Sequence, residues 1–542
     1  MTALRYWLRR LTRGEKAKMT PRRRAIIAAC AVLVLAGSGC GVWGALNHLS
    51  DDRVAAAKAR VAHARLLAIA HETCMNRGAT VVMWEGEGAA RECVGLTDGS
   101  FPFAQGNPAM ATVLKDIKAE DSSVRQQAAK GARYVSIAYL LPISATGGVE
   151  PINTAIEQLE GAYTAQLYAN QNNVQGGTSP LIQLLVASSG TSAAQWKHTD
   201  QFIENDVHSQ HLVAVAGIGV SLTTTIAEVR QLAGEDIPVF GGGISSDAFN
   251  HVPNMVRVVP SNADDVRAAL EFIQGASSAI LIEDTNPSDS YSATLGNEYF
   301  NGFTEKCGQC IQGPLSYDTS GEVSPKDPVG QNVNSSIGEM MSEICGSSTP
   351  LVLFAGRGRE LALLLSDLDT RICQTKPITI VTGDDITDMP PVPLSKTVSH
   401  GLGNVKVYYS GDANPDEWQQ GSGSVFTSGQ QGFSQFYNTF ESKFAGVALA
   451  DGNAMIGYDA MFTSINAARL VGSARLSPED VASKLSLLQG VDQVLGASGP
   501  IDLSADYSHN DMASNPVNKV VPILQWTPGG IKFKTLEHPP FG

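Results

Sequence analysis

The sequence predicts an α/β protein with two lobes, each formed by a largely parallel sheet, and with a cleft between the lobes. Short, uniformly apolar runs that end in glycine- and serine-rich turns are typical of parallel strands covered on both faces. Segments with helical periodicity separate these runs. Two such strand–helix series follow one another and are succeeded by a mainly helical return, so several crossovers should join the lobes.

The stretch 212–247 shows this pattern most clearly. Its order is a strand at 212–216, a turn that ends at Ser221, a helix at 222–234 and a strand at 238–240. A second polar turn, 241–247, begins with three glycines. Such units place two polar loops side by side at the carboxyl edge of a sheet, where open α/β sheets bind ligands.

The charge distribution argues against a nucleic-acid partner. The net charge is −14, and residues 1–24 carry nine Lys or Arg against a single Glu, so the rest of the protein is strongly acidic. Binding to nucleic acid requires a basic surface. Hydrophobic residues make up 43% and charged residues 17% of the sequence, as in globular proteins.

The N-terminal region is predicted to be a membrane anchor. Residues 25–46 carry no charge and would form a transmembrane helix of about 33 Å, preceded by the basic tail 1–24. The positive-inside rule puts this tail in the cytoplasm and the body on the extracellular side, which makes a single-pass protein of the cell membrane. A cleaved signal peptide and a lipoprotein modified at Cys40 are alternatives, and the uncleaved anchor is favoured.

Six cysteines follow the anchor, and sequence alone does not determine their pairing. Nearness in sequence favours Cys74–Cys93, Cys307–Cys310 and Cys345–Cys373. The CxxC spacing of the second pair also fits a redox motif or half of a zinc site. A structural disulfide is favoured there because the sequence has no second CxxC.

The elements divide the protein after the anchor into four parts. Residues 47–133 should form a stalk helix and a disulfide-containing lead-in, with a strand at 80–84 and a helix at 110–129. Residues 134–261 are the first part of lobe 1, with further strands at 134–141, 180–187 and 256–259 and helices at 152–170 and 196–208.

Lobe 2 is expected at 262–409. Its predicted helices are 263–274, 291–303 and 360–368, its strands are 279–282, 351–354, 378–381 and 405–409, and 321–334 is predicted to be a loop. Residues 410–495 return to lobe 1 through helices at 433–444, 456–470 and 478–489. The C-terminal strands in 496–542 should belong largely to lobe 2.

From about Tyr134 onward the sequence resembles the type I periplasmic solute-binding proteins, in the branch that binds leucine, isoleucine and valine for ABC importers. The matching segments are LEGAYTAQLYAN, the Gly219-Val220-Ser221 turn, VVPSN, FAGRGRELALLLSDL, TGDD and GYDAMFTSINAARL. Their order and spacing carry the resemblance over about three quarters of the sequence. The segment NNVQGGTSP departs from the glycine-rich turn of the amino-acid binders.

The resemblance implies a membrane-tethered solute-binding protein that captures a small polar ligand, with an amino acid as a candidate, for an ABC permease. The main alternative is a ligand-sensing or interaction ectodomain of the same fold. A cytoplasmic tail of 24 residues is too short for a signalling domain, which favours capture. A hydrolase or amidase on this fold is the least supported class.

The first-lobe ligand candidates lie in the two polar turns. Ser221, Thr223 and Thr224 at a helix N-terminus suit a carboxylate, and Asp247 suits an ammonium group. The other candidates in the second turn are Ser245 and Ser246. Helix capping by Ser221 and Ser246 is an equally good interpretation.

The second-lobe candidates follow strands. Asp284 and Tyr291 are similar in position to the family's second-lobe contacts. Gly356 and Arg357 lie in a strand–helix turn, where an arginine at the cleft would hold a carboxylate or form an inter-lobe salt bridge. Asp384, with Asp385 beside it, ends another strand; such a pair is more often solvated or capping.

Catalysis, metals and cofactors find no support. The sequence lacks GxSxG, P-loop and HExxH motifs, and its three-glycine loop lacks the spacing of a dinucleotide fingerprint. His208 and His211 are too few for a metal site. No enzymatic activity, metal or cofactor is therefore expected.

Overall fold

A computed structural model describes most of the protein from residue 74 onward. The described residues are 74, 76–77, 80–86, 91–104, 106–143, 150–174, 177–308, 310–320, 331–392, 402–419, 423–472, 476–504, 515–517 and 519–538. The protein divides into two units, Met1–Glu72 and Thr73–Gly542, and all described residues belong to the second. The predicted tail, transmembrane helix and stalk helix lie outside them. None of the helices in the described part is both long and apolar enough to span a bilayer.

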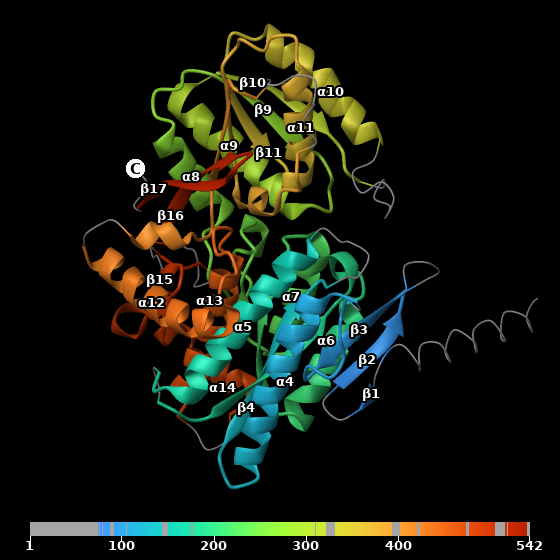
Figure 1. Cartoon of the computed structure of the whole chain (residues 1–542), viewed down its shortest axis with the longest axis vertical. Coiled ribbons are helices and arrows are strands. Elements are labelled where there is room, and N and C mark those ends of the chain that lie inside the picture. Colours follow the sequence, from blue (N-terminus) through green and yellow to red (C-terminus); the bar gives the residue numbers. More distant parts are fainter. Residues whose placement is uncertain are drawn as a thin grey trace, which may run out of the picture. The chain divides into compact units, whose positions relative to one another are not determined.

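The first lobe is organised around a sheet that the described residues form with eight strands (Figure 1). In spatial order these are β1 (Asn76–Arg77), β2 (Thr80–Glu85), β3 (Glu92–Thr97), β5 (Leu181–Ser188), β4 (Tyr134–Leu141), β6 (Leu212–Gly217), β7 (Val239–Gly241) and β8 (Met255–Arg257). Strands β5, β4, β6, β7 and β8 are parallel, whereas β1, β2 and β3 continue the sheet in antiparallel order. The region predicted as a lead-in therefore supplies strands to the first-lobe sheet.

Helices cover both faces of this sheet. One face packs against α4 (Pro108–Ala128), α5 (Ile152–Gln171), α12 (Ser424–Phe444) and α13 (Asn453–Leu470), and the other against α6 (Trp196–Ser209) and α7 (Thr223–Gly234). Gly161 in α5 lies against the backbone of Ala454, and Gly457 in α13 lies against the backbone of Gln158. Because these two glycines have no side chain, the backbones of α5 and α13 can approach each other closely.

The second lobe contains a sheet of seven strands within the described residues. In spatial order these are β10 (Ile311–Tyr317), β9 (Ala279–Asp284), β11 (Leu351–Ala355), β12 (Ile378–Thr382), β13 (Val405–Ser410), β16 (Val521–Thr527) and β17 (Gly530–Glu537). The first five are parallel, and β16 and β17 are antiparallel.

The central strands of this sheet are buried on both faces. Ile280 and Ile282 pack towards α10 (Gln331–Gly346) and α11 (Gly358–Thr370). Leu281, between them, packs towards α8 (Asn262–Phe272) and α9 (Ser290–Cys307). Burial on both sides explains why these strands read as uninterrupted apolar runs rather than as alternating patterns.

The polypeptide crosses between the lobes three times. It leaves the first lobe after β8, returns after β13 to form α12 and α13, and crosses again before β16. The return also contains α14 (Pro478–Ala482) and a small sheet of β14 (Val494–Gly496) and β15 (Gly499–Ile501). Helix α14 ends seven residues before the predicted end, because a 3₁₀ turn at 485–487 replaces its last part, and a second 3₁₀ turn follows at 490–492.

The sequence prediction missed several elements, among them β3, β10 and α10. Strand β10 interrupts its apolar residues with Gly313 and Pro314, and α10 begins within a segment predicted to be a loop from its Gly, Pro and Asn content. Disulfides join Cys74 to Cys93, Cys307 to Cys310 and Cys345 to Cys373. These are the pairs that nearness in sequence favoured.

Candidate functional site

A small cavity lies between the lobes at the carboxyl ends of both parallel sheets. Its volume is about 50 Å³, room for a few water molecules. The first lobe, with the α12–α13 return, contributes Glu150, Thr154, Gln158, Gly219, Val220, Ser221, Gly243, Ser245, Asp451, Asn453 and Ile456. The second lobe and the crossover after β13 contribute Tyr291, Arg357, Asp384, Asp385, Thr387 and Asp412.

The turn after β6 forms one wall of the cavity. Gly219 has a positive φ of 48°, and the Glu150 carboxylate and the Pro142 ring occupy the space that a side chain would need. Gln158 Nε2 donates to Glu150 Oε1 at 3.4 Å and so fixes the carboxylate beside the turn. The glycine therefore brings backbone and carboxylate together at the cavity edge.

Arg257 stabilises the first-lobe turn that follows β7, which contains residues 244–246. Its Nη1 donates to the carbonyl oxygens of Ile244, Ser245 and Ser246 at 3.2, 2.9 and 3.1 Å. Its Nη2 donates to Asn250 Oδ1 at 2.7 Å, and the side chain is 0% exposed. Burial lowers the pKa of Arg257, an effect that nearby carboxylates oppose. The turn that carries Ser245 thus rests on a buried guanidinium.

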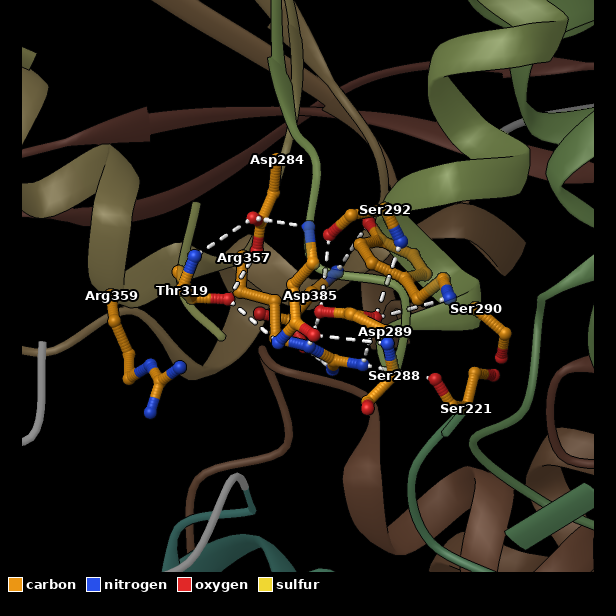
Figure 2. Close-up of polar contacts among 12 residues, drawn as sticks. Ser221, Asp284, Ser288, Asp289, Ser290, Ser292, Thr319, Arg357, Arg359 and Asp385 are labelled. Atoms are coloured by element: carbon orange, nitrogen blue, oxygen red, sulfur yellow. Dashed lines mark hydrogen bonds and ion pairs between the residues drawn. The ribbon is translucent and has the colours of Figure 1, made fainter. Parts of the chain in front are cut away.

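Arg357 is the cationic residue of the cavity lining, and the protein itself neutralises it (Figure 2). Its Nε and Nη2 donate to Asp289 Oδ2 and Oδ1 at 2.7 and 2.8 Å, a bidentate pair. Its Nη1 donates to Asp385 Oδ1 at 2.7 Å. Burial opposes the charge, but the two carboxylates outweigh this effect and raise the pKa of Arg357.

Both carboxylates are held in place by helix N-termini. Asp289 caps α9 and accepts from the backbone N–H groups of Tyr291 and Ser292 at 3.1 and 3.3 Å. Asp385 Oδ2 accepts from the Gly358 N–H at the start of α11 at 2.8 Å. The positive ends of two helix dipoles therefore hold the acids that bind Arg357.

Arg357 also reaches the first lobe. Its Nη2 donates to the Ser221 carbonyl oxygen at 3.2 Å, and the Tyr291 N–H donates to the same oxygen at 3.3 Å. The Arg357 guanidinium lies over the Tyr291 ring, 5.1 Å from its centroid. Two donors of the second lobe, the Arg357 guanidinium and the Tyr291 N–H, therefore bind the same carbonyl oxygen of the first lobe.

Further hydrogen bonds join the lobes, among them three that involve predicted site residues. The Thr223 N–H donates to the Ser288 carbonyl at 3.0 Å. The hydroxyl of Ser245 donates to Asp384 Oδ1 at 3.0 Å, and that of Ser246 donates to the Ser290 carbonyl at 2.9 Å. The two lobes are therefore in direct polar contact around the cavity.

The cavity is acidic. Its carboxyl groups are those of Glu150, Asp384, Asp385, Asp412 and Asp451. Burial, together with the neighbouring Asp385, raises the pKa of Asp384 to about 6, and burial also raises the pKa of Asp451. The Asp384 and Asp451 carboxyl groups therefore hold protons more tightly than carboxyl groups in water. Among the residues with described positions, no group of three or more His, Cys, Asp or Glu side chains is arranged to hold a metal ion.

Of the residues predicted to bind ligand, the structure brings five to the cavity: Ser221, Ser245, Tyr291, Arg357 and Asp384. Each follows the carboxyl end of a parallel strand. Asp384 hydrogen-bonds across the lobes. Arg357 lines the cavity, but its salt bridges to Asp289 and Asp385 lie within the second lobe, and it reaches the first lobe through the hydrogen bond to the Ser221 carbonyl rather than through an inter-lobe salt bridge.

The other six lie outside the cavity lining: Thr223, Thr224, Ser246, Asp247, Asp284 and Gly356. The Thr224 hydroxyl donates to the Ser192 carbonyl at 2.9 Å, within the first lobe. Asp247 accepts from Asn250, and Asp284 accepts from Asn286 and Thr319. The Tyr317 hydroxyl fills the space beside Gly356.

The capping interpretation is wrong for Ser221 and correct for Ser246. Leu222 occupies the N-cap position of α7 in an extended conformation, so Ser221 lies one residue too early to cap the helix. Its hydroxyl instead accepts from the Ser246 N–H at 3.3 Å. Ser246 caps the short 3₁₀ helix Asp247–Phe249 by accepting from the Ala248 N–H.

Sequence reasoning missed several residues of the site, among them three acids that line the cavity and Asp289, which binds Arg357, and some of them left a signal in the sequence. Asp412 follows β13, just as Asp384 follows β12. It could therefore have been predicted from the rule that ligands bind at the carboxyl ends of parallel strands. Asp289 precedes a predicted helix in the position of an N-cap. Glu150 and Asp451 precede α5 and α13, and no local pattern places those helix starts at the cavity.

Comparison with known proteins gives matches in structure and none in sequence. No protein-family model matches the sequence, and the comparison with curated proteins finds no match either. A leucine-binding protein from Thermotoga maritima is similar with a TM-score of 0.54 and 16% identity, over 75% of this protein and 99% of that one. A branched-chain amino acid ABC transporter protein from Thermus thermophilus with bound valine gives a TM-score of 0.52 and 11% identity, over 76% and 98%.

A solute-binding protein of an ABC transporter from Rhodopseudomonas palustris, in complex with 4-hydroxybenzoate, gives a TM-score of 0.52 and 12% identity, over 75% of this protein and 97% of that one. At these identities the likeness establishes the fold. The described part of the protein has the two-lobed α/β fold of the type I periplasmic solute-binding proteins, which confirms the fold predicted from the sequence.

Proposed function

We propose that the protein is a solute-binding protein that captures a small polar ligand by closing its two lobes, with no catalytic step. The cavity carries this proposal, because both lobes line it and inter-lobe hydrogen bonds surround it. Concave sites between domains that converge a few polar groups are typical of small-molecule binding. The ligands named for proteins of the same fold, amino acids and an aromatic acid, support a small ligand.

The predicted anchor and the fold together suggest where capture takes place. A helix at 25–46 would tether the body outside the cell membrane, and an ABC permease would receive the ligand. Tethering keeps the binding protein at a high local concentration beside such a permease. A branched-chain or other amino acid remains a candidate ligand.

Native mass spectrometry of the full-length protein in nanodiscs, after incubation with a cell extract, tests capture. The expected result is one bound small molecule, which a Thr387→Trp variant loses because indole fills the cavity. Thr112→Trp, on the exposed face of α4, is the matched control and should retain the molecule. Retention by Thr387→Trp, or no bound molecule in any form, would contradict the proposal.

A further inference from the structure

We infer that the cavity selects a ligand that carries an organic cation, such as a primary ammonium group, over a ligand that depends on a carboxylate for recognition. This inference rests on the proposed function and names the ligand class of the same site. Three features support it: the acidic lining, the internal neutralisation of Arg357, and a buried carboxyl group near two of the lining acids.

The lining itself is unbalanced in charge. Five carboxyl groups and a single guanidinium line a cavity of about 50 Å³, and one of the five, Asp385, is already paired with that guanidinium. Acid groups so close together, in a site with little water, repel one another strongly. A cationic ligand relieves this repulsion, whereas an anionic ligand adds to it.

Arg357 offers little to a ligand carboxylate. Four of its five N–H groups are already used, three by Asp289 and Asp385 and one by the Ser221 carbonyl. A carboxylate that binds there must compete with two carboxylates held by helix N-termini. The guanidinium therefore acts within the protein, and the net charge it presents to the cavity is low.

The helix N-terminus that the sequence indicated for a carboxylate is also engaged. The first N–H of α7, from Thr223, donates to the Ser288 carbonyl of the second lobe, and the Thr224 hydroxyl donates to Ser192. The α7 start thus contributes to lobe contact.

Asp265 is a buried acid near Asp384 and Asp412, which line the cavity and whose charges act on it. The residue is 1% exposed, and neither of its carboxyl oxygens accepts a hydrogen bond from the described residues. Burial, together with these two lining acids, raises the pKa of Asp265 well above its ordinary value, so the group holds its proton and adds no negative charge to the cavity. A positive group arriving with the ligand would favour the charged form of Asp265.

Calorimetric titration of the full-length protein in detergent at pH 7.5 and low salt tests the inference with four probes. These are 1,4-diaminobutane, n-butylammonium, leucine and 4-hydroxybenzoate. The diamine should bind most tightly, with butylammonium next, and 4-hydroxybenzoate should show no binding. Their size requires the lobes to part somewhat further than in this structure.

Asp384→Asn removes one negative charge while its amide oxygen can still accept from Ser245. It should weaken diamine binding at least tenfold. Asp318→Asn, an exposed acid of the second lobe, is the matched control and should leave the affinity unchanged.

Tighter binding of leucine or 4-hydroxybenzoate than of the diamine would overturn the inference and leave the capture proposal intact. Unchanged diamine affinity in Asp384→Asn would also overturn it. No binding of any of the four probes would count against both the inference and the proposed function.

Discussion

Two buried arginines stand on either side of the cavity and act in opposite ways. Arg257 in the first lobe donates to three carbonyl oxygens of one turn and to Asn250. Arg357 in the second lobe donates to two carboxylates and to a carbonyl of the other lobe. Their exposures are similar, at 0% and 4%.

The partners, rather than the burial, decide what each arginine does. The hydrogen bonds that Arg257 donates go to groups of its own lobe, so its contribution to stability is the same in open and closed arrangements of the lobes. Arg357 loses a hydrogen bond when the lobes part, so it contributes to closure as well as to folding. Substitutions at the two positions should therefore separate stability from lobe movement.

Arg257→Met should give the largest loss of stability. It removes four hydrogen bonds and leaves three buried carbonyl oxygens without this donor, a loss of about 4 kcal/mol in the free energy of unfolding. Urea denaturation followed by circular dichroism measures it. Arg267→Met, on the exposed side of α8, is the control and should cost less than about 0.5 kcal/mol. Equal losses of unfolding free energy in the two variants would contradict a structural role for Arg257.

Arg357→Met should cost less, about 2–3 kcal/mol. Asp289 loses its cation but keeps the two N–H groups of α9 and the Ser292 hydroxyl, and these partly compensate for the buried charge. Unlike the Arg257 variant, this one should also shift the lobes towards an open arrangement. Pulsed electron paramagnetic resonance with one spin label in each lobe measures that shift.

Arg357→Lys sharpens the comparison, because it keeps the charge and removes the planar fork. An ammonium group cannot bind Asp289 in bidentate fashion while also reaching Ser221. An intermediate loss of about 1–2 kcal/mol is therefore expected in the same urea experiment. A lysine variant as stable as the original protein would show that charge alone suffices.

The acidity around Arg357 should make ligand binding depend on pH. The groups that face Asp384 include Asp385, Arg357, Asp265 and Tyr291. Burial raises the pKa of Asp384 to about 6, so this carboxyl group is charged above that pH and neutral below it. Since a cation favours the charged form, affinity for 1,4-diaminobutane should fall as pH decreases below 6, by up to about tenfold per unit.

Titrations between pH 7.5 and 5 measure this dependence. Asp384→Asn should flatten the profile in that range, because the titrating group is gone. A profile that keeps its slope in the variant would assign the proton to another carboxyl group.

Ser221→Ala should have the smallest effect. The cavity loses one hydroxyl, and the Ser246 N–H loses its acceptor, which together cost about 1 kcal/mol of binding free energy, or roughly fivefold in affinity. The carbonyl that Arg357 grips is unchanged, so lobe closure should persist. Ser122→Ala, on the exposed face of α4, should leave affinity unchanged in the same titration.

The sequence predicted those site residues that a local pattern marks, and it missed those that only the tertiary fold brings together. Ser221, Ser245 and Asp384 lie two to four residues after the ends of apolar strands, and the rule that ligands bind at the carboxyl ends of strands found them. The partners of Arg357 escaped because Asp289 lies 68 residues away in the sequence, and no local pattern relates the two positions. Charge pairing across such distances is decided by the tertiary fold.

The secondary-structure elements likewise divide into those with a clear local sequence pattern, which were predicted, and those without one, which were missed. The parallel strands were predicted from their apolar runs because burial on both faces makes those runs uniform. Strand β3 and helix α10 were missed. The exposed and half-buried residues of α10 interrupt its apolar spacing, and its start lies in a loop-like composition.

The most direct test of the central claim is the distance between the lobes in the full-length protein, with and without ligand. Spin labels attached through unnatural amino acids at Gln126 in α4 and Glu343 in α10, both exposed, report it by pulsed electron paramagnetic resonance. Capture by closure predicts a broad distribution that narrows to its short-distance component on addition of 1,4-diaminobutane, and that remains broad in Arg357→Met. A distribution that none of the four probes changes would contradict capture by lobe closure.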